Sequence, residues 1–193
     1  RSTVHRNTYL DYVGVKRFDA DGKVVGERRF LGLYTGSSYA QPLSMIPVLR
    51  RLEQQTADMA GVDASSHRGK DFLHFIESYP RDDLFQVGAE ELYQVGTAVL
   101  GMQERRMVRV FLRRDAYGRF YSVLVYLPRD RYTTTNRIEI QRILTEALHG
   151  VAVDYTTTVG ESLLARLNYT VRIDPAYRDE HIDTDALEAR IRA

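Results

Sequence analysis

The spacing of hydrophobic positions changes along the chain, and each spacing predicts a different kind of element. Residues 8–35 carry two apolar runs on either side of the segment DADG, where Gly22 supplies the positive φ of a tight turn. Residues 44–60, 63–80 and 88–106 instead have apolar side chains three or four positions apart, as in amphipathic helices. The first half of the chain therefore predicts a β-hairpin followed by three helices.

The predicted helices differ in how well their sequences suit a helix. Gly61 is a plausible end for the first, and the second should end before Pro80. Gly96 and Gly101 weaken the third by about 1 kcal/mol each relative to alanine. The apolar faces are expected to comprise Ile46, Leu49, Leu52 and Met59, then Phe72, Leu73, Phe75 and Ile76, then Leu92, Val95, Val99 and Met102.

From residue 107 the pattern becomes that of a β-sheet. Val108, Val110 and Leu112 alternate with arginines, which predicts a half-buried strand that turns at the segment DAYG. Residues 119–128, RFYSVLVYLP, are apolar on both faces and predict a central strand. A capped helix over 133–150, strands over 151–160 and 162–173, and a helix from Asp183 or Thr184 should follow.

This order, β-β-α-β-β-α, predicts an α+β fold. It is the ferredoxin-like arrangement with its last strand moved to the front of the domain. The move is topologically sensible, because the last strand of that fold lies antiparallel beside the first and a short hairpin can join them.

Composition argues against nucleic acid as a partner. The chain has 27 basic and 26 acidic residues, a formal net charge of +1, whereas nucleic-acid-binding domains carry a strongly basic face. The RNP1 pattern of RNA-binding sheets is also missing, since Gly118 precedes Arg119 and no small residue separates Phe120 from Tyr121. Apart from three lysines the basic residues are arginines, which suits recognition of planar anions but equally fits the codon usage of a GC-rich genome, the reading we favour.

The residues of known catalytic chemistry do not form a recognisable motif. The chain has no cysteine, its five histidines lack metal-ligand spacing, and the patterns GxSxG, GxGxxG and Walker A do not occur. We therefore expect no catalytic, cofactor-binding or metal-binding residue in this chain. No apolar run of 18 residues and no signal peptide is present, which predicts a soluble, cytoplasmic protein, and the start at Arg1 suggests a piece of a longer one.

One loop is a candidate binding site. Residues 127–136, LPRDRYTTTN, link the predicted central strand to the next helix, whose first N–H groups and dipole favour anions. A carboxylate, such as that of an amino-acid effector, could be held by Arg129 and Arg131 together with the hydroxyls of Thr133, Thr134 and Thr135. The alternative is a solvated loop with a threonine cap and a weak Arg–Asp surface pair.

Four segments of the chain resemble the N-terminal half of the large-subunit bacterial NAD-specific glutamate dehydrogenases. In chain order they are VHRNTYLDYVGVKRFDADGKVVGERRFLGLYT, YPRDDLFQ, RRDAYGRFYSVLVYLPRDRYTTTNR and VGESLLARLNY. The resemblance covers nearly the whole chain. It implies that residues 1–37 are the closing strands of a PAS-like module, 38–106 a helical connector and 107–193 an ACT-like domain.

The resemblance also implies a function. The family oxidises L-glutamate to 2-oxoglutarate and ammonia with NAD, but none of its catalytic or cofactor residues falls in this stretch. ACT domains bind amino acids beside a glycine in the loop that corresponds to 127–136, and this loop has none, so an assembly role is also open. We therefore expect a non-catalytic regulatory and assembly segment, partnered by the rest of its parent chain and by sister subunits of a homo-oligomer. The alternative is a free-standing ACT-type amino-acid-sensing module.

Overall fold

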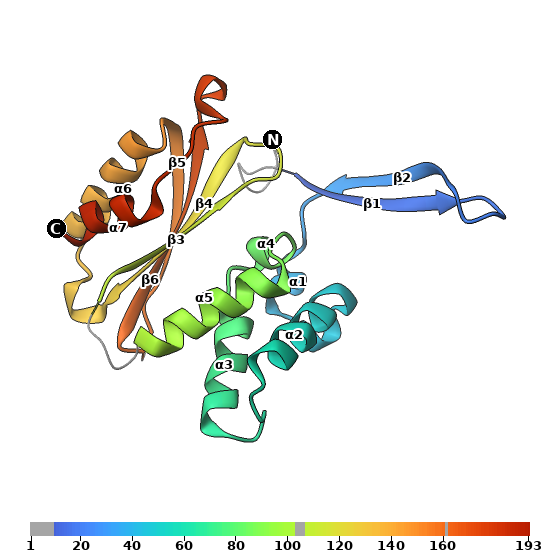
Figure 1. Cartoon of the computed structure of the whole chain (residues 1–193), viewed down its shortest axis with the longest axis horizontal. Helices are drawn as coiled ribbons and strands as arrows, with labels where there is room; N and C mark the ends of the chain where they lie inside the picture. Colours follow the sequence, from blue (N-terminus) through green and yellow to red (C-terminus); the bar gives the residue numbers. More distant parts are fainter. Residues whose placement is uncertain (1–9, 103–106, 161) are drawn as a thin grey trace. The chain divides into compact units, whose positions relative to one another are not determined.

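The computed structural model describes residues 10–102, 107–160 and 162–193 (Figure 1). The chain divides into two compact units, residues 1–46 and 47–193. Within the described ranges, no helix combines the length and the hydropathy needed to cross a membrane.

The first unit contains the predicted hairpin. Strands β1 (Asp11–Phe18) and β2 (Val24–Gly32) pair antiparallel, and Gly22 between them has a φ of +78°. Short helices α1 (Gly36–Ala40) and η1 (Leu43–Met45) follow. Large apolar side chains remain exposed on both strands, including Phe18 and Leu31 at 60% and 67%. Because a two-stranded hairpin is marginal by itself, these side chains constitute a surface that needs a cover.

The second unit begins with four helices, one more than the sequence pattern predicted. They are α2 (Pro47–Ala60), α3 (His67–Ser78), α4 (Arg81–Leu84) and α5 (Ala89–Met102). The first starts at Pro47 rather than Ser44, because proline suits the first helical position. Met59, expected in the core, is 42% exposed, whereas Thr56 is fully buried and its hydroxyl donates to the Leu52 carbonyl. The single turn α4 had no periodicity to reveal it.

Residues 107–193 form the predicted sheet. Its strands are β3 (Arg109–Arg114), β4 (Phe120–Pro128), β5 (Gly150–Thr158) and β6 (Leu164–Ile173). They lie in the order β3-β4-β6-β5 with antiparallel neighbours, which confirms the ferredoxin-like arrangement with its last strand moved to the front. The intervening helices are α6 (Thr134–Ala147) and α7 (Thr184–Arg192), with short turns η2 (Arg129–Arg131) and η3 (Pro175–Tyr177).

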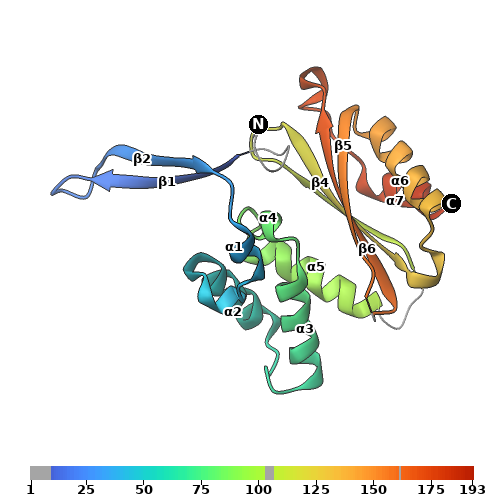
Figure 2. The same ribbon diagram turned by 180° about the vertical axis from the view of Figure 1, so that it is seen from behind.

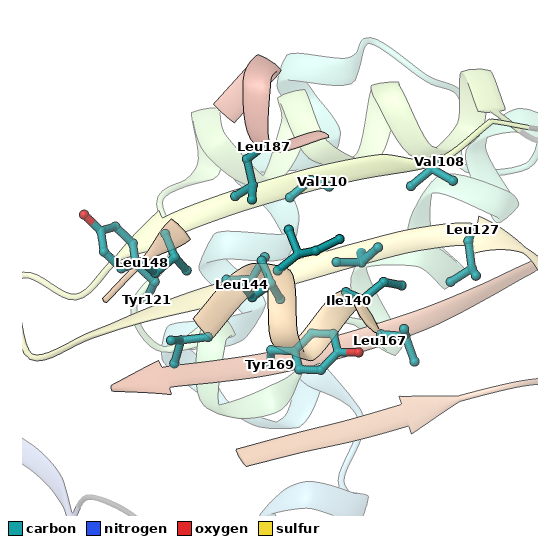
Figure 3. Close-up of a cluster of buried hydrophobic side chains, with 14 of the residues drawn as sticks. Val108, Val110, Tyr121, Leu127, Ile140, Leu144, Leu148, Leu167, Tyr169 and Leu187 are labelled. Atoms are coloured by element: carbon teal, nitrogen blue, oxygen red, sulfur yellow. The ribbon is translucent and has the colours of Figure 1, made fainter. Parts of the chain in front are cut away.

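Helices α6 and α7 cover one face of this sheet, as the two opposite views show (Figures 1 and 2). The core between them is apolar (Figure 3); it includes Val110, Val123, Val125, Leu144, Leu167, Tyr169 and Leu187. Every residue of β4 is buried, so the prediction of a strand covered on both faces is confirmed. The second cover is supplied by the helices that precede the sheet.

Helix α6 ends at Ala147, three residues before the predicted end at Gly150. His149, with a φ of +48°, leaves the helix in the left-handed conformation, and Gly150 already begins β5. A Cβ on Gly150 would lie 2.8 Å from Cγ1 of Val171. Glycine is therefore needed at 150 because the strands approach closely there, rather than because the helix ends there.

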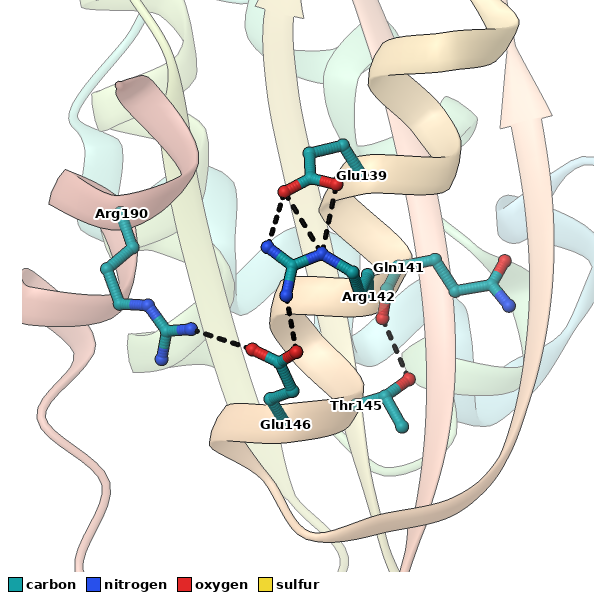
Figure 4. Close-up of polar contacts among 6 residues, drawn as sticks. All are labelled: Glu139, Gln141, Arg142, Thr145, Glu146 and Arg190. Carbon is teal, nitrogen blue, oxygen red and sulfur yellow. Dashed lines mark hydrogen bonds and ion pairs between the residues drawn. The ribbon is translucent and has the colours of Figure 1, made fainter.

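The two helices are also joined on their outer surfaces (Figure 4). Arg142 of α6 pairs with Glu139 at 2.6 Å and with Glu146, and Arg190 of α7 reaches Glu146 at 3.2 Å. All four side chains are about half exposed, so solvent screens these pairs and each adds little stability.

One sheet edge is closed by a side chain. The backbone N–H of Val110 in β3 donates to Oε2 of Glu188 at 2.9 Å, and Glu188 is 7% exposed. Arg109 and Arg192 contact the other carboxylate oxygen. Helix α7 therefore satisfies an edge N–H that would otherwise be open to another strand.

Gly96 offers a test of the helical packing. A Cβ there would lie 2.8 Å from the rings of Phe72 and Phe75. We expect Gly96→Ala to lower the free energy of unfolding by about 1–3 kcal/mol, because overcrowding outweighs the better helix propensity. Gly101→Ala is the matched control in the same helix, since its added Cβ would meet no atom of another described element within 4 Å. It should stabilise the protein slightly in urea unfolding; equal effects of both changes would contradict the packing argument.

Candidate functional site

The loop predicted to bind an anion continues directly from β4. Arg129 and Arg131 form the turn η2, where the Arg129 N–H donates to the Leu163 carbonyl at 2.8 Å. Asn136 Nδ2 donates to the Arg131 carbonyl at 2.8 Å, which ties the loop to the first turn of α6. Both arginine side chains are exposed, and their guanidinium groups have no hydrogen-bond or ion-pair partner within the described ranges.

The three threonines of this loop are not equivalent. The Thr133 hydroxyl accepts from the Asn136 N–H at 3.1 Å and caps α6, as an N-cap residue should. Thr134 and Thr135 are exposed in the first helical turn, where backbone N–H groups lack helical acceptors. The five predicted residues thus lie within one short segment, with one hydroxyl already engaged; anion binding there stays a prediction.

A different site carries the buried polar chemistry of the second unit. Asp83 in α4 is only 6% exposed. Its carboxylate forms an ion pair with Arg113 of β3 and accepts from the Ser122 hydroxyl of β4 at 2.8 Å. Arg113 also donates to Oε1 of Gln86 at 3.3 Å. We call Asp83, Arg113 and Ser122 the α4–sheet joint, because they connect the helices to the sheet.

Opposing effects act on the ionised carboxylate of Asp83 in this joint. Burial raises the pKa of Asp83, while the Arg113 charge and the hydrogen bonds from Ser122 and Arg113 oppose that rise. Burial also raises the pKa of Glu91 in α5, which Arg113 partly offsets and Asp83 increases. A buried carboxylate that lost Arg113 would have no adequate counter-charge, so each partner depends on the other.

The joint is suited to holding elements together. Its carboxylate is engaged by the Arg113 charge and by the Ser122 hydroxyl, and all three groups are buried or nearly so. Residues 10–102, 107–160 and 162–193 also contain no group of three His, Asp or Glu side chains that could hold a metal ion.

Sequence reasoning missed this site. The patterns of the sequence assign no role to Asp83, and they place Arg113 only among the arginines that alternate with the apolar residues of a predicted half-buried strand. In the structure both side chains are largely buried, at 9% exposed for Asp83 and 13% for Arg113. The available signal was the segment YPRDDLFQ, in which Pro80 interrupts the helical pattern and Asp82 and Asp83 follow after one arginine.

A double-mutant cycle tests the joint. Asp83→Ala should lower the free energy of unfolding by about 3–5 kcal/mol, because it leaves Arg113 buried without a counter-charge. Arg113→Ala should have a similar cost, and the double variant should be more stable than the sum predicts by about 0.5–3 kcal/mol. Asp82→Ala, which removes the neighbouring exposed carboxylate in the same turn, is the control and should cost much less stability than Asp83→Ala. Additive effects in denaturant unfolding would rule out coupling.

Comparison with known proteins gives the two regions of the second unit a family. Residues 46–105 match the model of glutamate dehydrogenase helical motif 1, and residues 109–193 match the model of the glutamate dehydrogenase ACT2 domain. The α4–sheet joint therefore links these two regions.

The relatives of the chain are much longer proteins. It is 44% identical over 171 residues to an NAD-specific glutamate dehydrogenase of Halomonas elongata, covering 89% of this chain and 11% of that one. Against that of Pseudomonas aeruginosa it is 41% identical over 190 residues, covering 98% and 12%. Against that of Mycobacterium tuberculosis it is 37% identical over 172 residues, covering 86% and 10%. The chain spans about a tenth of these relatives, and it belongs to the NAD-specific glutamate dehydrogenase family, as the segment that contains helical motif 1 and the ACT2 domain.

Proposed function

We propose that this segment is a non-catalytic regulatory and assembly part of a large glutamate dehydrogenase. The parent enzyme would convert L-glutamate and NAD to 2-oxoglutarate, ammonia and NADH, with NAD bound outside the segment. The observation that carries the proposal is the α4–sheet joint: Asp83 commits its charge to Arg113 and Ser122, between two regions of the parent. A displacement of the helices would thereby be transmitted to the sheet.

The partners in this proposal are the rest of the parent chain and its sister subunits. The hairpin β1–β2 supports this, because its exposed apolar side chains need a cover. Val13, Val15 and Phe30 lie on one face of the hairpin, since Val13 pairs with Phe30 and side chains alternate along each strand. As the end of a PAS-like module, the hairpin would bury this face against the other strands of that module.

The proposal is tested in the isolated chain and in the intact enzyme. The chain with glutamate and NAD should form no NADH, and formation proportional to its concentration would refute the proposal. In the intact enzyme, Asp83→Ala should alter the subunit mass distribution or the shape of the glutamate saturation curve, whereas Asp82→Ala should alter neither. Wild-type assembly and saturation in Asp83→Ala would show that the joint transmits nothing.

A second role is binding of an amino-acid or 2-oxo-acid effector at the 127–136 loop. It is favoured by the guanidinium groups of Arg129 and Arg131, which are unpaired within the described ranges beside the first turn of α6.

Thermal unfolding of the chain against a panel of these acids tests the loop. An effector at about 100 times its dissociation constant adds about 2.7 kcal/mol, or roughly 5–10 °C for a domain of this size. Arg131→Ala should abolish the shift, and Arg178→Ala, an exposed arginine after β6, should retain it. A shift that survives Arg131→Ala would place the effector elsewhere.

A further inference from the structure

Three buried polar atoms that have no geometrically sound hydrogen-bond partner among the described residues lie on the sheet face opposite α6. They are Oη of Tyr126, Oδ1 of Asn168 and Nε of Arg172. The strand register places them on the same face. Asn168 pairs with Leu124 and Arg172 pairs with Phe120, and Leu124 and Phe120 are an even number of residues from Tyr126 along β4, so their side chains point to the same side. Native proteins leave few buried polar atoms unsatisfied, so such a concentration on one face needs a physical cause.

Two of these atoms belong to neighbouring cross-strand rows. One row runs from Arg109 through Tyr126 and Arg166 to Thr158. The next row contains Asn168, about 6.7 Å along β6 from Arg166 at the rise of an extended strand. We call Tyr126, Arg166, Asn168 and Thr158 the β6 cluster.

The β6 cluster carries an uncompensated positive charge. Arg109, in the same row, is paired with Glu188 at 3.3 Å. Arg166 has no carboxylate partner within the described ranges; its Nη2 donates to the Thr158 hydroxyl at 3.2 Å, and its guanidinium lies beside the Tyr126 hydroxyl. Guanidinium groups bind carboxylate or phosphate oxygens more strongly than a neutral hydroxyl. Arg166 could therefore exchange the Thr158 hydroxyl for the carboxylate of a ligand.

The Tyr126 hydroxyl is poised as a hydrogen-bond donor. Tyr126 is 5% exposed, and burial raises the pKa of its hydroxyl, although Arg166 opposes the rise through its charge and through a polar contact with this hydroxyl. The packing of Tyr126 does not require this hydroxyl, since its ring contacts Phe111 edge to face at a centroid distance of 6.0 Å. A phenylalanine would make the same contact without burying an unpaired polar atom.

We propose that the β6 cluster binds a carboxylate that carries a hydrogen-bond donor close to it. The Arg166 guanidinium turns from Thr158 to the carboxylate and gives it access to the Tyr126 hydroxyl. The neighbouring N–H or O–H of the ligand donates to Oδ1 of Asn168. The carboxylate comes either from a free small molecule or from an acidic side chain of another part of the parent enzyme. This site is separate from the 127–136 loop and does not depend on the proposed regulatory role.

Free carboxylates are tested by NMR titration of the chain with lactate and with propionate, at ionic strength held constant with NaCl. These probes differ by one hydroxyl donor. We expect saturable shifts around Tyr126 and Asn168, with tighter binding of lactate. Arg166→Gln should weaken binding by about ten-fold or more, the loss expected for a charge-assisted hydrogen bond, and Arg178→Gln is the matched control. Asn168→Leu should remove the advantage of lactate.

The Tyr126→Phe variant separates a ligand role from a folding role. It removes only the unpaired hydroxyl, so the melting temperature without ligand should stay equal or rise, while the response to lactate is lost. A lower melting temperature with an unchanged lactate response would show that the hydroxyl serves folding, and would overturn the proposal.

Reaction of Arg166 with phenylglyoxal distinguishes the two sources. Protection by added lactate in the isolated chain identifies a free carboxylate. Protection in the intact enzyme without any addition, but not in the isolated chain, identifies an acidic side chain of the parent. Equal reaction rates in the chain, the chain with lactate and the intact enzyme, together with no saturable titration, would refute both sources.

Discussion

The second unit depends on one constraint: the carboxylate of Asp83 is buried and must keep its partners. Arg113 and Ser122 come from two adjacent strands, so this carboxylate fixes where α4 lies on the sheet. That contact in turn lets the helices cover β4 on the face opposite α6, and every residue of β4 becomes buried. A salt bridge of this kind contributes more to the choice of one arrangement than to net stability, because both ions lose their hydration.

The sheet has two unlike faces because the strands differ in what they present. The α6 face is filled by aliphatic side chains from three strands and by the rings of Tyr121 and Tyr169. The opposite face changes from apolar on β4 to polar on β6 and β5, where Asn168, Thr156 and Thr158 follow one another across the strands. One side of this face thus packs mainly apolar residues of β4 against the helices, whereas the other side presents polar side chains of β6 and β5.

The sheet could be predicted from the sequence, whereas the α4–sheet joint could not, because the two depend on different kinds of contact. The burial of β4 and the order of the strands follow from local patterns: apolar residues on both faces of RFYSVLVYLP, and Gly118 with a φ of +63° in the hairpin turn. Asp83 could not be recognised this way, because its burial depends on strands about 30 and 39 residues further along. In the sequence Gly96 only weakens a helix; in the structure it makes room for the rings of Phe72 and Phe75 in α3. The 127–136 loop was identified from its residues, but local sequence carries no information on what occupies it.

The contact of Glu188 with the β3 edge has a consequence for how the chain must be handled. An uncovered strand edge is a template for pairing with other chains, and β3 contains the apolar run Val110, Phe111 and Leu112, which would favour such pairing. A shortened chain that ended before α7 would lose both Glu188 and the core residue Leu187. Such a fragment would tend to aggregate as well as unfold, so the last helix also acts as a safeguard against self-association through the sheet.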